Sequence, residues 1–84
     1  MNIVDSSGWL EYFADGPNAK HYQQPLKDID SLIVPVVTLY EVFKVVLRES
    51  DESEALQAAA AMQKGKVVEM TVNLAIAASK LSLQ

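Results

Sequence analysis

The stretch LIVPVVTLYEVFKVVLR, residues 32–48, decides how this chain is expected to fold. Its first part, residues 32–37, is continuously apolar and rich in β-branched side chains, which is typical of a strand covered on both faces in a parallel sheet. Pro35 has no amide hydrogen for a strand ladder, so the strand is expected to end near it. From Thr38 onward the apolar residues recur at helical spacing, which predicts an amphipathic helix. Those apolar residues are Leu39, Val42, Phe43, Val46 and Leu47.

Upstream of this stretch, the sequence predicts a short strand, a helix and a weaker helical segment. Residues 2–4 form an apolar run that ends at Asp5, and Gly16 is expected to close the following helix by taking a positive φ. Residues 18–30 favour a second helix that Pro25 splits or restarts. The first helix carries aromatic residues at i, i+3 and i+4, which we interpret as core: Trp9, Tyr12 and Phe13.

Downstream, the alternation of helix and strand continues. Residues 52–63 are rich in alanine and follow Asp51, a good helix N-cap, so they predict a helix. Residues 66–71 predict a short strand, and Thr71 is expected to cap a last helix. Because helices always separate the strands, we expect parallel pairing with right-handed crossovers. The predicted fold class is therefore α/β.

Composition limits the size of the protein and its chemistry. With 84 residues, half of them apolar, the chain is expected to form one small domain. Cysteine is absent, so a metal would be held by oxygen atoms or by His21, which favours hard cations. The net charge of -4 has the wrong sign for holding nucleic acid by bulk charge. Binding of RNA would therefore need a local device, such as a divalent cation on an acidic cluster.

The chain shows no pattern that predicts export or membrane insertion. The N-terminal residues have no basic region and no small-residue cleavage site, so no secretory signal is expected. The most apolar stretch, residues 32–47, is shorter than a bilayer requires and contains Glu41 and Lys44. A cytoplasmic protein with no membrane partner is the expectation.

Two acidic residues are the best candidates for a functional site. In an open parallel sheet, ligands collect outside the carboxyl ends of the strands. Asp5 directly follows the first predicted strand and Glu41 follows the second by one helical turn, so we expect both carboxylates at the same edge. Each also has a structural interpretation. Asp5 fits a helix N-cap or an Asx turn, and Glu41 fits a capping box with Thr38.

Other polar side chains are weaker candidates. His21 lies in a polar segment and is expected to be an exposed histidine without a catalytic role. Lys44 and Arg48, four residues apart, are the best candidates for contacts with phosphate, although lysines on polar helix faces ordinarily serve solubility. The sequence contains no glycine-rich phosphate loop, no Ser-His-Asp order and no zinc-ligand spacing.

Three segments, MNIVDSSGWLEYF, LIVPVVTLYEVFKVVL and KVVEMTVNLAIAASKLS, together resemble the N-terminal two thirds of PIN-domain toxins of the VapC type. The resemblance implies a three-layer α/β sandwich with a short parallel sheet and flanking helices. It also implies that Asp5 and Glu41 bind Mg2+ or Mn2+ for cleavage of RNA. Ser6 matches a hydroxyl residue beside the metal, and Thr38 opens the Thr-x-x-Glu motif. Such toxins usually form homodimers and are inhibited by a cognate antitoxin protein.

By the same resemblance, the sequence ends before the Asp-containing segment that completes the family's site. We therefore expect residues 1–84 to be the N-terminal part of a PIN-like domain, incomplete at the C-terminus and weakly active or inactive as a ribonuclease. Residues 2–4 would then form an exposed sheet edge that a second copy or a partner covers. The alternative is a non-catalytic PIN remnant that serves dimerisation or antitoxin binding. A generic nucleotide-binding fragment is a third interpretation, but phosphate-cradling glycines are missing.

Overall fold

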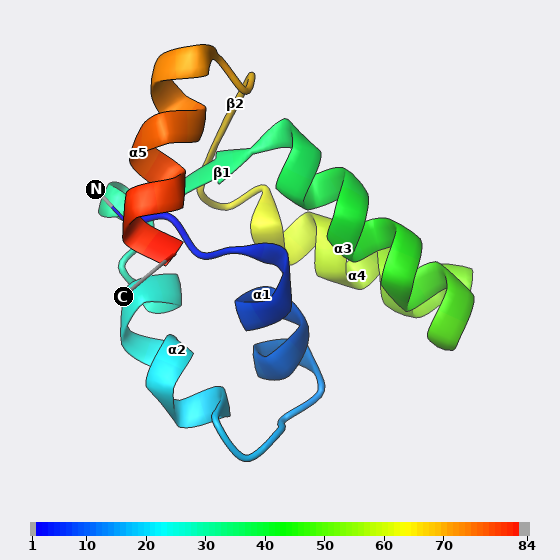
Figure 1. Cartoon of the computed structure of the whole chain (residues 1–84). Helices are drawn as coiled ribbons and strands as arrows, with labels where there is room; N and C mark the ends of the chain where they lie inside the picture. Colours follow the sequence, from blue (N-terminus) through cyan, green and yellow to red (C-terminus); the bar gives the residue numbers. More distant parts are fainter. Residues whose placement is uncertain (1, 83–84) are drawn as a thin grey trace.

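The computed structural model describes residues 2–82 and has the predicted α/β architecture. Within these residues it contains five α-helices, one 3-10 turn and a short parallel sheet of two strands. In chain order these are α1 (Ser6–Phe13), α2 (Ala19–Lys27), η1 (Ile29–Ser31), β1 (Ile33–Pro35), α3 (Val36–Glu49), α4 (Glu52–Met62), β2 (Lys66–Val68) and α5 (Val72–Ser82). Figure 1 shows α3 and α4 side by side and reaching away from the sheet, with α5 on the other side of the strands.

The sheet has the predicted parallel pairing. Ile33, at the start of β1, pairs with Lys66 of β2. On the opposite side of β1, Asn2 pairs in parallel with Leu32, but only as an isolated bridge, so the strand predicted over residues 2–4 is realised at one position. The amide of Ile33 donates to the carbonyl oxygen of Asn2 at 2.8 Å. The next amide facing this side would belong to Pro35, which has none, and this explains why the ladder stops.

The hydrophobic core lies between β1 and the helices that surround it. Val34, Val42 and Met62 have no exposed surface, and Trp9 of α1 is 2% exposed. Tyr12 and Phe13 are partly buried and pack against this core. The interpretation of these aromatic residues as core is confirmed.

Helix α3 begins at Val36, two residues earlier than the sequence predicts. Pro35 is its N-cap residue, with φ -60° and ψ 138°, and no side chain caps the helix. Because Thr38 lies inside α3 rather than at its start, the capping-box interpretation of Thr38 and Glu41 is wrong. A proline ring holds φ near the helical value without further help, so the chain passes from β1 directly into the helix.

The segment around α1 and α2 corrects two further predictions. Pro25 lies inside α2 and does not split it, because it stands in the last turn and leaves only one amide position of the helix without a donor. The positive φ after α1 belongs to Asp15, at 52°, and not to Gly16. A Cβ at Gly16 would meet only the carboxylate at the end of the flexible Glu11 side chain, which can shift.

Two caps follow the sequence-based prediction. The side chain of Asp51 accepts a hydrogen bond from the amide of Glu54 at 2.7 Å and starts α4. The hydroxyl of Thr71 accepts one from the amide of Leu74 at 3.1 Å and starts α5. These short-range hydrogen bonds fix where the last two helices begin.

Candidate metal centre

Asp5 is the N-cap residue of α1, as one of its two interpretations predicted. Its backbone is extended, and its Oδ1 atom accepts a hydrogen bond from the amide of Gly8 at 2.9 Å. The hydroxyl of Ser7 donates to the same Oδ1 atom, also at 2.9 Å. Among the described residues, no group donates to Oδ2, and the side chain is exposed. The Oδ1 atom therefore caps α1, while the Oδ2 atom remains open to a ligand.

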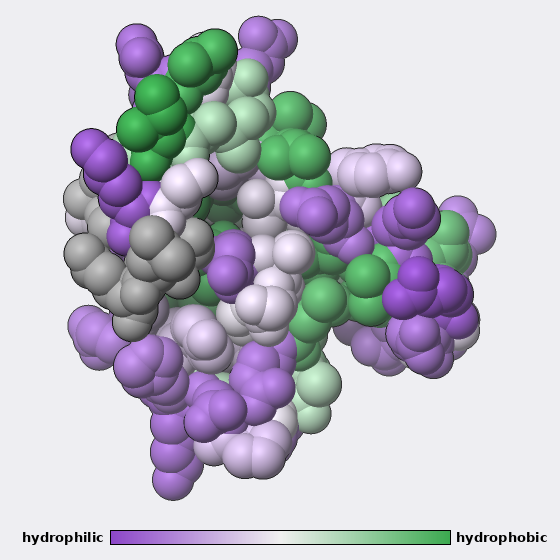
Figure 2. All heavy atoms as spheres, in the orientation of Figure 1, coloured by the Kyte–Doolittle hydropathy of each residue, from purple (hydrophilic) through white to green (hydrophobic). Residues whose placement is uncertain are grey.

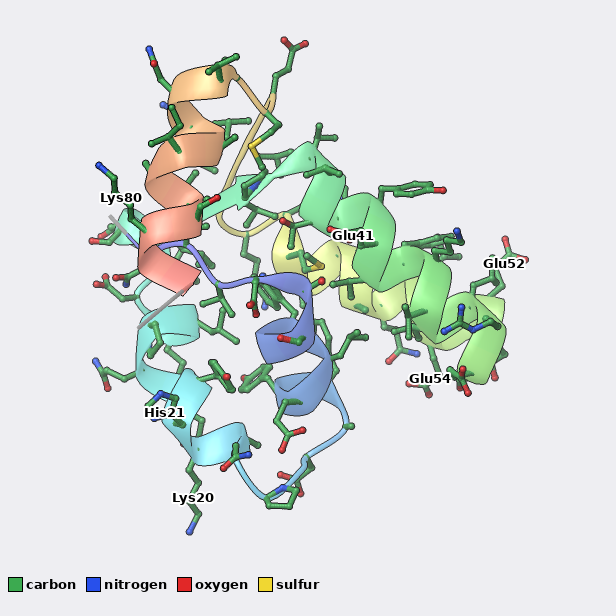
Figure 3. The ribbon with its side chains drawn as sticks, in the orientation of Figure 1. Lys20, His21, Glu41, Glu52, Glu54 and Lys80 are labelled. Carbon is green, nitrogen blue, oxygen red and sulfur yellow. The ribbon has the colours of Figure 1, made fainter. Side chains whose placement is uncertain are left out.

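Glu41 lies in the second turn of α3 and is exposed (Figure 3). Because α3 is capped by Pro35 and not by a hydroxyl residue, the Glu41 carboxylate has no capping role. Within residues 2–82 no hydrogen bond or ion pair engages it. Its oxygens are available for a ligand.

A hollow of about 240 Å³ brings the predicted site residues together. Asp5 and Ser6 come from the start of α1, and Thr38 and Glu41 come from α3. Helix α5 closes the other side with small side chains. The residues that line this hollow, which we call the acidic hollow, are Ile3, Asp5, Ser6, Pro35, Val37, Thr38, Glu41, Met70, Ala75, Ala78 and Ser79.

The hydroxyl residues around the acidic hollow have different surroundings. Thr38 is only 6% exposed, because it lies on the side of α3 that faces the core. Ser6 is half-buried and lines the hollow. Ser7, which the sequence-based prediction left out, is the serine that holds Asp5. The Asp-Ser-Ser sequence contained the signal, since a serine two residues after an aspartate can bond back to it.

His21 and the acidic hollow lie apart. The side chain of His21 is exposed on α2, as expected, and packs edge-on against Tyr22 with ring centroids 5.2 Å apart. Figure 3 shows it on the far part of α2, well away from Glu41. Among the described residues, no histidine therefore lines the acidic hollow.

Comparison with known protein families gives one clear match, to the PIN domain, over residues 3–84. The chain belongs to the PIN-domain family. Curated proteins and solved structures yielded no match. PIN domains are generally nucleases that act on nucleic acid with the help of divalent metal ions. Within residues 2–82 of this PIN domain, no helix has the length and apolarity needed to cross a membrane.

The donor set of this PIN domain fits a hard divalent cation, with few protein ligands. Asp5 and Glu41 supply carboxylate oxygens, and Ser6 and Thr38 supply hydroxyl groups at the same hollow. Mg2+ accepts such an arrangement because it keeps several of its own water molecules. Among the described residues, however, no group of three or more acidic, histidine or cysteine side chains could hold a metal ion. The acidic hollow thus offers two carboxylates from residues 2–82.

A second hollow of about 580 Å³ lies between α1 and the outer part of the α3 and α4 pair. It contains none of the predicted site residues of this PIN domain. Apolar side chains form most of its wall, and Glu49 and Glu54 add negative charge. Its lining residues, which define the apolar hollow, are Leu10, Phe13, Ala14, Val45, Val46, Glu49, Ser50, Glu54, Gln57 and Ala58.

Proposed function

We propose that this PIN domain is a divalent-metal-dependent ribonuclease, a VapC-type toxin of the cytoplasm, with Asp5 and Glu41 as ligands of Mg2+ or Mn2+. The observation that carries the proposal is the acidic hollow, which is lined by two exposed carboxylates, one at the start of α1 and one in α3. Asp5 offers its Oδ2 atom, and Glu41 has both oxygens open. Such a site lets an acidic protein attract RNA locally, since bound cations reverse the sign of the field.

Each residue of the hollow has a part in this proposal. The amide of Gly8 and the hydroxyl of Ser7 fix the orientation of Asp5 through Oδ1. Ser6 and Thr38, which line the hollow, would hydrogen-bond water there. A divalent cation, when bound, would lower the pKa of a coordinated water and offset charge on the phosphate. The protein groups hold the substrate and the water in position.

We expect the activity of this 84-residue chain to be weak. Two carboxylates leave most of an octahedral coordination sphere to water, so the affinity for Mg2+ or Mn2+ should be low. Low occupancy of the site limits turnover. As the resemblance to VapC toxins implies, we also propose that the protein acts as a homodimer under control of an antitoxin. The exposed side chains of Val72 and Ile76 on α5 are apolar surface that a second copy would cover.

The experiment that tests the metal site measures binding of Mn2+ by electron paramagnetic resonance, together with Mn2+-dependent cleavage of single-stranded RNA. Asp5→Asn and Glu41→Gln should each reduce both. The matched control is Asp51→Asn, because Asp51 is also an exposed N-cap aspartate whose side chain accepts from an amide, but lies outside the hollow. Unchanged Mn2+ binding in both hollow variants would overturn the proposal, whatever the cleavage rate.

The apolar hollow favours a second candidate function, a non-catalytic module that binds an antitoxin. Its apolar wall with Glu49 and Glu54 suits a segment with apolar side chains flanked by lysine or arginine. Coexpression with the protein encoded beside this chain tests it. Val45→Glu, inside the hollow, should abolish copurification, whereas Leu47→Glu, exposed on the same helix but outside the hollow, should not. Copurification with both variants would place the partner elsewhere.

A further inference from the structure

Three residues of α3 stand four positions apart: Tyr40, Lys44 and Arg48. In an α-helix, residues at i and i+4 lie next to each other on one face. All three are exposed, in a chain whose net charge is -4. We call them the α3 ladder. It combines an aromatic ring with two cationic groups on the same strip of surface.

Tyr40 and Lys44 are in direct contact. The Nζ atom of Lys44 lies 5.7 Å from the centroid of the Tyr40 ring, within the range of a cation–π interaction. Tyr40 is nevertheless 62% exposed, so a ring face remains open to solvent. The contact holds the lysine beside the ring.

Arg48 continues the ladder away from the sheet. Its Nε atom lies 3.1 Å from Oε1 of Glu49, with both side chains about two thirds exposed, at 63% and 67%. An ion pair this exposed is weak, because water and salt screen it. The guanidinium is therefore free to exchange Glu49 for a phosphate group at little cost.

The ladder leads to the acidic hollow. Glu41, which lines the hollow, precedes Lys44 by three residues and Arg48 by seven, so all three lie on adjoining strips of the helix. Seven residues correspond to about 10 Å along a helix axis. An RNA strand that contacts Arg48 and Lys44 would thus be directed toward the carboxylates of Asp5 and Glu41.

We propose that the α3 ladder binds single-stranded RNA, with an unpaired base stacked on Tyr40 and backbone phosphates on Lys44 and Arg48. The proposal rests on the ribonuclease function above and adds the α3 residues that hold the RNA and the path along which it reaches the acidic hollow. Phosphate contacts explain the cationic pair, and an exposed aromatic ring suits an unstacked base. Bases of a duplex are already stacked, so the ring favours a single strand.

The experiment measures RNA affinity in a background where RNA is not cut. In the full chain carrying Asp5→Asn and Glu41→Gln, fluorescence anisotropy reports binding of a short labelled single-stranded oligoribonucleotide. Tyr40→Leu should weaken this binding by about tenfold, the loss typical of one stacked base. Lys44→Gln and Arg48→Gln should each lower affinity and also reduce the salt dependence of binding. The same RNA as a duplex should bind less tightly and should be insensitive to Tyr40→Leu.

The matched control is Lys20→Gln, which removes one exposed positive charge from α2, away from the ladder (Figure 3). It should leave affinity unchanged. Equal binding of single-stranded RNA by the ladder variants and their background would overturn the proposal. So would a Tyr40→Leu variant whose oligomeric state changes in light scattering while its RNA affinity does not. This measurement involves neither metal binding nor cleavage. A negative result would therefore contradict RNA binding by the ladder without contradicting the proposed metal site, which the Mn2+ experiment tests.

Discussion

Gly8 donates its backbone amide to the Oδ1 atom of Asp5, at 2.9 Å, while the Oδ2 atom of the same carboxylate stays open beside the acidic hollow. From the sequence, a capping role and a ligand role for Asp5 are alternatives. In the folded chain they are compatible, because a carboxylate has two oxygens and the cap uses one. The cap also stabilises the geometry that a ligand role would need.

The first prediction concerns this cap. Asp5→Ala should lower the free energy of unfolding by about 1 kcal/mol, because the amide of Gly8 loses its acceptor. Asp5→Asn should keep most of the stability, since an asparagine side chain caps equally well. Urea denaturation followed by circular dichroism measures both. Equal losses in the two variants would show that the loss comes from the missing charge and not from the capping hydrogen bond.

The second prediction concerns Ser7. Its hydroxyl donates to Asp5, so Ser7→Ala should leave the carboxylate less well oriented and reduce Mn2+ affinity by about tenfold, as loss of a group that orients a ligand typically does. Calorimetric titration with Mn2+ measures the change. Ser53→Ala, an exposed serine of α4, is the control and should have no effect. Identical affinities for the two variants would contradict the orienting role.

The third prediction concerns the packing of α1 on α2. A Cβ at Gly8 would lie 2.6 Å from Cγ1 of Val4 and 2.9 Å from Cε1 of Tyr22, so Gly8→Ala forces the core to shift. The expected loss is about 1–3 kcal/mol of unfolding free energy, typical of overpacking. Gly16→Ala should cost less, because its obstacle is the end of a flexible Glu11 side chain. Thermal unfolding of both variants decides the order, and a more stable Gly8→Ala chain would refute it.

The fourth prediction concerns Met62, which has no exposed surface at the end of α4. Met62→Ala leaves a cavity in the core and should cost about 2–5 kcal/mol. For a small domain this is a large share of total stability. Met70→Ala, at a position that is 38% exposed, should cost much less. Urea midpoints that shift equally would mean that Met62 does not support the core.

The order and pairing of the elements were predictable from local signals. Asp51 and Thr71 cap their helices, as carboxylate and hydroxyl side chains generally do. The strands pair in parallel because helices separate them along the chain. The start of α3 was not predictable in the same way. A helix start at Thr38, with its hydroxyl as cap, and a start directly after Pro35, whose φ is fixed, are both compatible with the sequence. The way the chain leaves β1 selects the start after Pro35.

The candidate site was predictable in part. The rule for strand ends placed Asp5 and Glu41 at one edge, and the acidic hollow contains both, although their role as metal ligands stays a prediction. The wall from α5, with Ala75 and Ala78, could not be predicted. Small apolar side chains carry no chemical signal, and their position depends on how α5 packs against distant parts of the chain.

The surface of α5 and the ladder differ in character. Figure 2 shows strongly apolar surface where α5 begins, consistent with the exposure of Val72 and Ile76, and more polar surface along the outer part of α3. Apolar patches favour contact with protein, and cationic strips favour contact with phosphate. A second copy on Val72 and Ile76 and RNA on the ladder would therefore use different helices, α5 and α3.

The burial of Trp9 gives this protein a built-in optical reporter. It is the only tryptophan in the sequence, it is 2% exposed, and it stacks on Phe13 with ring centroids 5.6 Å apart. Within the described residues its indole Nε1 has no hydrogen-bond partner, so its fluorescence should be blue-shifted in the folded state and move to longer wavelength on unfolding. Its amide donates to the carbonyl of Asp5 at 3.1 Å, so emission also senses the turn that carries the proposed ligand. If Asp5 binds Mn2+ as proposed, we expect the emission of Trp9 to report the titration without any label.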